Sequence, residues 1–275
     1  DPYEEPDPNF GWRLKANYKS VDFSPDTGKE ENFIINSKGF RGKEFNKEKS
    51  SNTIRVITMG DSVTFGITPE SCPYPSQLQK LFDEKDPNKF EVINAGVPGY
   101  SSEHVLKRLK HDILQYKPDI ITIYVGWNDL YSVNPHKPWN YKKVSDLANL
   151  LNKFYVYKGG RKFIFSVLKP KIEQVLISDR VKEKNIVLYQ NFESEIYKNN
   201  LKDIIKVCHD NNVKVILLNL ASILSDEMSL EAIKKVHYPY FSSDIEKLKI
   251  LQQNYNNVIK RISQEENVFN RSVDQ

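Results

Sequence analysis

A serine, Ser62, stands in a segment, Gly60–Gly66, whose residue types suit acyl-transfer chemistry. The segment follows a short β-branched run that predicts a strand over 53–59. A serine just past a strand end can present its hydroxyl in a cleft while its backbone N–H points to the same place, which brings a nucleophile and an oxyanion donor together. The structural alternative is that Asp61 or Ser62 only caps the next helix. The segment has neither the Gly-Lys-Ser/Thr of a phosphate-binding loop nor the Gly-x-Ser-x-Gly elbow of α/β-hydrolases.

Two further strand ends carry residues that could serve the same chemistry. Gly96 follows the strand predicted over 90–94, and its backbone N–H could approach a substrate oxygen without a side chain in the way. Asn128 follows the most apolar strand, 120–125, and offers a side-chain N–H of the kind that stabilises an oxyanion. Taken singly, each also fits ordinary turn chemistry.

The elements that must position these residues alternate between short apolar strands and longer amphipathic helices. Such alternation predicts a parallel sheet with helices on both faces, in which ligands bind beyond the carboxyl ends of the strands. Ser62, Gly96 and Asn128 are therefore expected to meet at one edge. The expected strands are 53–59, 90–94, 120–125 and 213–218, and the expected helices are 74–84, 101–116, 192–211 and 243–265.

The sequence divides into an arm and a main domain. Residues 1–50 are rich in Pro, Gly and Asn and are too short to hold a core of their own, so we expect an irregular or small β arm that packs on the rest. Residues 51–275 are expected to form one α/β domain. Within it, 135–190 reads as an insertion, with helical stretches at 144–154 and 163–177.

The three strand ends together resemble the SGNH (GDSL-type) hydrolases, whose blocks are Gly-Asp-Ser, a donor glycine and Gly-x-Asn-Asp. The resemblance covers roughly residues 53–130, and the stretch 36–42 is similar to one that precedes the first strand in bacterial members. It implies a flavodoxin-like three-layer α/β/α fold and serine-dependent hydrolysis of acyl esters, O-acetyl groups on carbohydrate among them. By this resemblance Ser62 is the nucleophile, and the N–H groups of Ser62 and Gly96 form the oxyanion hole with the Asn128 side chain. It implies no metal or organic cofactor, and a bacterial extracytoplasmic location.

The general base is the open question. The family's last block is Asp-x-x-His, and none of the five histidines here has an aspartate three residues earlier. One explanation is that the chain stops short: a fifth strand is expected after the last helix, and Asp274 would begin a block whose histidine follows Gln275. The other is that His237 serves as the base. His104 and His111 are expected to be structural, and His209 is expected at the end of a helix.

Composition argues against several other kinds of protein, such as nucleic-acid binders, disulfide-rich proteins and membrane-spanning proteins. The chain has 275 residues and a formal net charge of +4, from 40 basic and 36 acidic side chains that alternate along most segments, so no nucleic-acid partner is expected. Cys72 and Cys208 are too few for a disulfide framework and lack metal-ligand spacing, and Cys208 is expected to be a buried free thiol. No apolar run is long enough to span a membrane, and no signal peptide is visible at the trimmed-looking start. The oligomeric state stays open.

Two rival functions remain. One is an acyltransferase that uses the same site to acylate a surface polymer. The other is a non-catalytic carbohydrate-binding protein without the base. Aromatic residues follow the third block and suit either stacking on a sugar or a hydrophobic lid: Trp127, Tyr131, Trp139 and Tyr141.

Overall fold

The computed structural model describes residues 2–24, 28–66, 73–132, 186–222, 224, 229, 236 and 244–271. The expected helices at 144–154 and 163–177 lie outside these residues, as do Cys72, His237 and Asp274. Two compact units divide the chain. The larger comprises Asp1–Asp129, Ser194–Ala221 and Tyr255–Gln275, and the smaller comprises Leu130–Glu193 and Ser222–Asn254.

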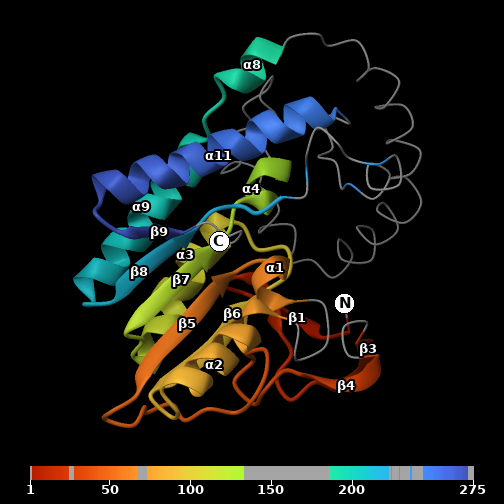
Figure 1. Ribbon diagram of the computed structural model, residues 1–275, viewed down its shortest axis with the longest axis vertical. Helices are drawn as coiled ribbons and strands as arrows, with labels where there is room; N and C mark the ends of the chain where they lie inside the picture. The colour runs from red at the N-terminus through yellow and green to blue at the C-terminus, as the bar shows by residue number, and fades with distance from the viewer. Residues whose placement is uncertain are drawn as a thin grey trace. The chain divides into compact units, whose positions relative to one another are not determined.

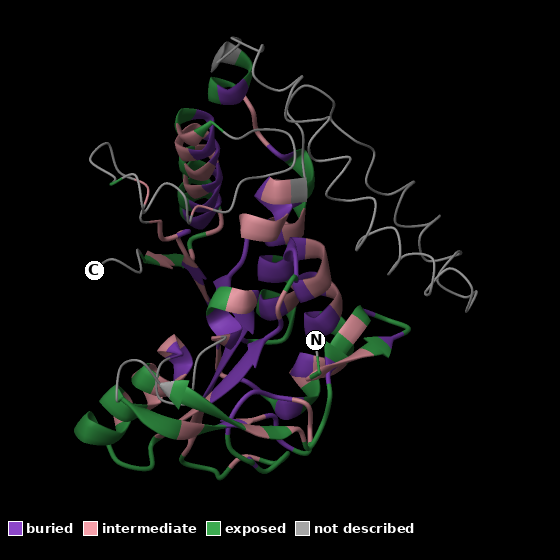
Figure 2. Cartoon of the chain, turned by 90° about the vertical axis from the view of Figure 1, so that its right-hand side faces the viewer, coloured by how far each residue is buried: buried purple, intermediate pink, exposed green. Residues whose placement is uncertain are grey.

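A five-stranded parallel sheet forms the centre of the larger unit, in the order β6-β5-β7-β8-β9. Apolar and β-branched runs make the first four of these strands, and β5 and β7 are almost wholly buried, whereas β9 is largely exposed; Figure 2 shows buried strands at the centre of the unit in purple. Their bounds are β5 Ile54–Gly60, β6 Phe90–Gly96, β7 Ile120–Tyr124, β8 Lys214–Leu218 and β9 Phe269–Arg271. The fifth strand expected after the last helix is β9, which pairs with β8.

Helices cover both faces of the sheet, so the fold is the expected three-layer α/β/α arrangement (Figure 1). The chain steps from β5 to β6 in one direction and then returns across the sheet, and right-handed crossovers therefore place α2 on the face opposite α3 and α9. α2 packs on β6, while α3 packs on α9. The helix bounds are α1 Ser62–Phe65, α2 Tyr74–Lys85, α3 Ser102–Arg108, α4 Trp127–Ser132, α9 Glu195–Asp210 and α11 Ile245–Glu265.

The helix predicted over 101–116 changes its winding along its length. α3 is followed by a π segment, Leu109–Ile113, and a 3-10 turn, Leu114–Tyr116. The stretch ends at Lys117, whose φ of 51° is left-handed and turns the chain toward β7.

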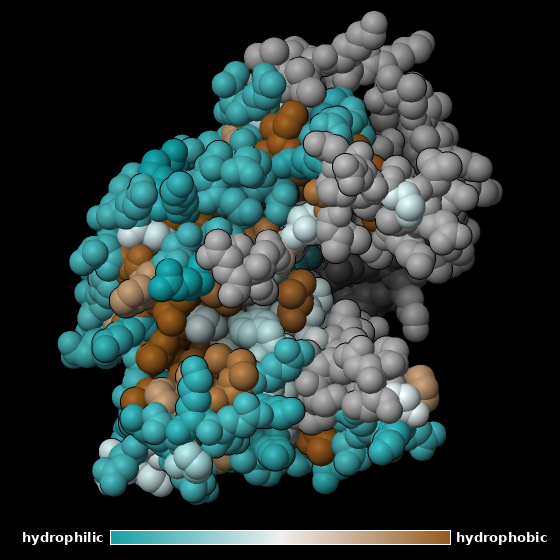
Figure 3. All heavy atoms as spheres, in the orientation of Figure 1, coloured by the Kyte–Doolittle hydropathy of each residue, from teal (hydrophilic) through white to brown (hydrophobic). Residues whose placement is uncertain are grey.

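α2 leaves part of its face of the sheet open. The Tyr74 hydroxyl of α2 lies 3.2 Å from the Thr122 hydroxyl. The side chain of Thr122 in β7 therefore points to the face of the sheet on which α2 packs. Toward the β8–β9 edge, Ile216 on the same face is only half-buried and its neighbour Phe269 is 64% exposed. Figure 3 shows hydrophobic side chains gathered over the sheet between α2 and α11.

Two antiparallel hairpins make up most of the N-terminal arm (Figure 1). β1 (Glu4–Asp7) pairs with β2 (Gly11–Leu14), and β3 (Lys19–Ser24) pairs with β4 (Lys29–Ile34). The Arg41 N–H donates to Asn94 O of the edge strand β6 at 3.1 Å. The arm therefore belongs to the same unit as the sheet and joins it by backbone pairing.

A buried arginine, Arg55, links the end of the arm to the edge of the sheet where the strands begin. This edge is opposite the one that carries the predicted site residues. Arg55 is 0% exposed, and its Nε donates to Glu91 at 2.6 Å. Its other guanidinium nitrogens donate to the carbonyls of Asn46, Lys47 and Tyr116. These bonds and the carboxylate satisfy a charge that burial would otherwise make very unfavourable.

The smaller unit contributes one described helix besides parts of α4 and α11. This helix, α8, spans Ile186–Gln190, and the helix predicted from residue 192 begins only at Glu195 in the larger unit. Asn254 Nδ2 donates to the carbonyls of Tyr189 and Phe192, and the Lys247 ammonium lies 5.0 Å from the Tyr189 ring centroid.

Candidate active site

The first strand end brings Ser62 to the first residue of the short helix α1. Asp61 is the N-cap, and its carboxylate accepts the Val63 N–H at 2.9 Å, so the capping interpretation holds for this residue. Gly60 must be a glycine, because a Cβ there would lie 2.1 Å from Tyr124 O. The tight turn thus depends on close packing between β5 and β7.

Asp61 is nearly inaccessible, with 1% of its surface exposed. One carboxylate oxygen binds the Val63 N–H, and the other, Oδ2, has no hydrogen-bond partner among the residues that the structure describes. Burial, with a smaller effect from nearby Asp129, raises the pKa of Asp61 to about 7. The carboxyl is therefore substantially protonated at neutral pH.

The second strand end uses Gly96 for packing. Its N–H donates to Asn94 Oδ1 at 3.0 Å, and a Cβ on Gly96 would lie 2.3 Å from Phe65 N. The Asn94 amide also donates to the Thr64 carbonyl at 2.9 Å. The N–H that the sequence assigned to an oxyanion is thus already bonded within the junction between β6 and α1.

A turn, Val97–Tyr100, follows directly. The Tyr100 N–H donates to Val97 O at 3.2 Å, and Gly99 has φ +78°. A proline second and a glycine of φ about +80° third define a type II turn. Pro98 O at its centre accepts the Trp12 indole N–H at 3.0 Å.

The third strand end is joined to the second by two adjacent side chains. Asn128 Nδ2 donates to Tyr100 O at 2.9 Å. Asp129 accepts the Ser102 N–H at 2.9 Å and the Ser102 hydroxyl at 2.5 Å. Asn200 of α9 donates in turn to Ser102 Oγ at 2.8 Å. Burial raises the pKa of Asp129 to about 6 although the Ser102 bonds oppose the rise.

Strand register sets these three ends at one level. Gly60, the last residue of β5, lies opposite Gly96 on one side and Tyr124 on the other. Ser62, the Val97–Tyr100 turn and Asn128 therefore follow three adjacent strands at the same edge. Sequence reasoning found the three ends but missed the Asp129–Ser102–Asn200 connection, for which the only signal was the aspartate in the Gly-x-Asn-Asp block.

The described histidines have other roles. His104 Nδ1 lies 2.8 Å from Ser101 Oγ, and its ring is stacked 5.1 Å from that of Tyr100. Burial lowers the pKa of His104 to about 4, so the ring is neutral. His111 and His209 are exposed. Within the described ranges no hydrogen bond joins a histidine to Ser62, and His237 lies outside them.

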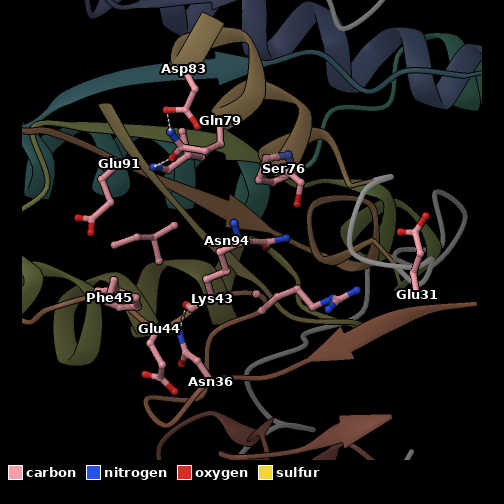
Figure 4. A pocket seen from close by; sticks show the side chains of 15 residues that line it. Glu31, Asn36, Lys43, Glu44, Phe45, Ser76, Gln79, Asp83, Glu91 and Asn94 are labelled. Atoms are coloured by element: carbon pink, nitrogen blue, oxygen red, sulfur yellow. Dashed lines mark hydrogen bonds between the residues drawn. The ribbon is translucent and has the colours of Figure 1, made fainter. Parts of the chain in front are cut away.

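A groove of about 500 Å³ runs beside β6, between the arm and α2 (Figure 4). Gln79 of α2 spans it: its amide donates to Asp83 and Phe90 O, and its carbonyl accepts the Val92 N–H at 2.6 Å. These bonds occupy the edge of the sheet and oppose pairing with another strand. None of the three predicted site residues lines this groove.

Among the described residues, no group of three His, Cys, Asp or Glu side chains is arranged to bind one metal ion. Among the helices described, none combines the length and apolar character that crossing a membrane requires.

The protein belongs to the class of three-layer α/β/α proteins. Its parallel sheet carries a serine, a glycine-containing turn and an asparagine at the ends of three adjacent strands. Residues 58–270 match the model of the GDSL-like lipase/acylhydrolase family, and the chain belongs to that family. The predicted resemblance is confirmed.

Three known proteins show distant similarity to the chain. An uncharacterized lipoprotein, YqeF, of Bacillus subtilis (strain 168) is 29% identical over 109 residues, which are 39% of this chain and 43% of that protein. The chain thus spans less than half the length of this relative. A GDSL-like lipase from Bacteroides thetaiotaomicron is 15% identical with a TM-score of 0.41, covering 79% of this chain and 67% of that one. An acetylxylan esterase from Geobacillus stearothermophilus is 16% identical with a TM-score of 0.45, covering 79% and 74%.

Proposed function

We propose that Ser62 is the nucleophile of a serine esterase that releases acids from acyl esters. Ester hydrolysis in general follows from membership of the lipase/acylhydrolase family. The observation that carries the finer proposal is the position of Ser62, at the start of α1 on the sheet edge that also carries Asn128 and the Val97–Tyr100 turn.

In the proposed reaction, Ser62 Oγ forms a bond to the ester carbonyl carbon while its proton passes to a histidine base. The carbonyl electron pair moves onto oxygen, and hydrogen-bond donors stabilise that oxyanion. The carbon–oxygen bond to the alcohol then breaks, the alcohol takes the proton, and the acyl group remains on Ser62. Water repeats these steps, releases the acid and restores the serine.

We assign the oxyanion donors to the N–H groups of Ser62 and Gly99 and to the Asn128 amide. Gly99 replaces Gly96 in this assignment, because the Gly96 N–H is bonded to Asn94. In a trans peptide the C=O and N–H point in opposite directions. Since Pro98 O faces Trp12, the Gly99 N–H of the same peptide points away from Trp12.

Asp129 positions Asn128 in this proposal. Its two bonds to Ser102 and the Asn128 bond to Tyr100 hold the start of α4 at two points against the start of α3. The Asn128 amide and the turn that carries the Gly99 N–H then belong to one hydrogen-bonded unit. Preorganised donors of this kind need no rearrangement when charge develops.

The base is a histidine outside the described residues, and His237 is the candidate within the sequence. His104, the described histidine nearest the turn, is neutral and bonded to Ser101. A serine without a base is a weak nucleophile, so the proposal requires this histidine.

We propose short acyl esters as the substrate class, with O-acetylated carbohydrate to be tested first. Trp127 supports this choice, because it is half-buried beside Asn128 and offers an aromatic surface on which a sugar can stack. We also propose an extracytoplasmic location, which the name of the Bacillus subtilis lipoprotein supports.

Turnover of p-nitrophenyl acetate, longer p-nitrophenyl esters and acetylated xylo-oligosaccharides tests the proposal. We expect hydrolysis of the short esters that disappears in Ser62→Ala and in His237→Ala. Hydrolysis that persists in Ser62→Ala would refute the nucleophile, and hydrolysis that persists only in His237→Ala would move the base to another histidine.

A further inference from the structure

Trp12 of β2 lies in the arm, outside the segment 58–270 that the family model matches, yet it contacts the turn that carries Gly99. Its indole N–H donates to Pro98 O at 3.0 Å, across 86 residues of sequence. A Cβ on Gly99 would lie 3.1 Å from Trp12 Cζ2, so the indole also packs directly beneath the glycine. A side chain from the arm thus stabilises the turn, both by a hydrogen bond and by packing.

Tyr100 completes this junction. Its hydroxyl donates to Trp12 O at 2.7 Å, and the two rings meet edge to face with centroids 5.5 Å apart. The Trp12 ring also lies 4.9 Å from that of His104. Contacts with Pro98, Tyr100 and His104 therefore hold the indole in place and fix the direction of its N–H.

A type II turn can convert to type I by rotation of its central peptide, which reverses the C=O and the N–H together. The sequence Pro98-Gly99 is compatible with type I as well, since proline suits the second position of both turns and glycine accepts either sign of φ. Local sequence therefore does not settle which way the Gly99 N–H points. The Trp12 hydrogen bond favours the orientation in which Pro98 O faces the arm.

We infer that Trp12 is a positioning residue for the esterase reaction: its indole N–H holds the Pro98–Gly99 peptide so that the Gly99 N–H faces the oxyanion. This inference rests on the proposed function. It assigns the N-terminal arm a part in catalysis, through the orientation of one peptide rather than through contact with substrate.

The test compares Trp12→Phe with wild type. Phenylalanine keeps an aromatic ring at this position and removes the N–H donor, together with the outer indole atoms that contact Gly99. Loss of one oxyanion donor slows acyl transfer by about 100-fold or more, and a peptide that points correctly only part of the time should slow it by about tenfold. We expect kcat and the rate of fluorophosphonate labelling to fall by that factor while KM changes less than about twofold.

Phe45→Leu is the matched control. Phe45 packs on Phe40 and Tyr116 in another part of the arm, so its truncation weakens the arm without touching the turn. We expect it to lower the thermal unfolding temperature at least as much as Trp12→Phe and to leave kcat unchanged. If both variants lower kcat in proportion to their stability, Trp12 is merely structural and the inference is overturned.

NMR of the Gly99 amide provides a second readout that does not depend on turnover. We expect a single sharp signal in wild type and exchange broadening or a shifted signal in Trp12→Phe. Equal labelling rates in wild type and Trp12→Phe, with an unchanged Gly99 signal, would overturn the inference and leave the esterase proposal intact. A folded wild type that is never labelled would instead refute the proposed function.

Discussion

Asp61→Asn should stabilise the protein increasingly as the pH rises. Asn keeps a side-chain oxygen to accept the Val63 N–H and is a good N-cap, so the helix start is retained. What the substitution removes is a buried carboxyl whose Oδ2 is unpaired among the described residues and whose pKa is raised to about 7 by burial.

The sign follows from linkage. A carboxyl whose pKa is higher in the folded than in the unfolded state stabilises the fold fully below its unfolded pKa, and that contribution is lost as the pH rises through the folded pKa. A pKa of about 7 against 3.8 corresponds to about 4 kcal/mol at high pH, at about 1.4 kcal/mol for each pH unit. Between pH 5 and pH 8 the difference between variant and wild type should grow by about 2.5 kcal/mol.

Urea unfolding followed by circular dichroism at pH 5, 6, 7 and 8 measures this difference. Asp203→Asn, the same substitution at an exposed position of α9, is the matched control. If Asp61→Asn destabilises the protein by the same amount at every pH, the carboxyl is ionised and paired in the folded state, and the reasoning from burial fails.

Three further predictions concern the strand ends and the core. Asn128→Ala should lower kcat by about 100- to 1000-fold with little change in KM, because it removes one of the proposed oxyanion donors; steady-state kinetics on a short ester check this, and an unchanged kcat would exclude the donor role. Gly96→Ala should lose more than about 4 kcal/mol of unfolding free energy in urea, since the new Cβ would meet Phe65 N at 2.3 Å; a stable variant would mean that α1 can move away. Cys208 is buried, and burial raises the pKa of its thiol to about 12, so iodoacetamide should modify it in urea and not in the native protein by mass spectrometry.

Sequence reasoning succeeded where the signal is local. Runs of β-branched residues located four strands within about two residues, and apolar stripes located α2 and α11. The residues of the fifth strand, expected after the last helix, were not located, because Phe269–Arg271 is short, lies at the edge of the sheet and contains two polar residues. Such a segment becomes a strand only because β8 offers it a partner.

Assignments that depend on contacts far apart in sequence were harder to predict. A glycine at position 96 suggested an oxyanion donor, but glycine is required there because Phe65, 31 residues earlier, leaves no room for a side chain. The Gly96 N–H donates to the Asn94 side chain. The orientation of the Gly99 N–H depends on Trp12. Neither relation leaves a periodic pattern in the chain.

Intact-mass analysis after incubation with a fluorophosphonate, followed by peptide mapping, tests the central claim most directly. The reagent forms a stable bond with a serine only when that serine is activated as a nucleophile. We expect one adduct per chain, located on Ser62 and absent from Ser62→Ala. A folded wild-type chain that takes no label, or that carries the label on another residue, would contradict the account.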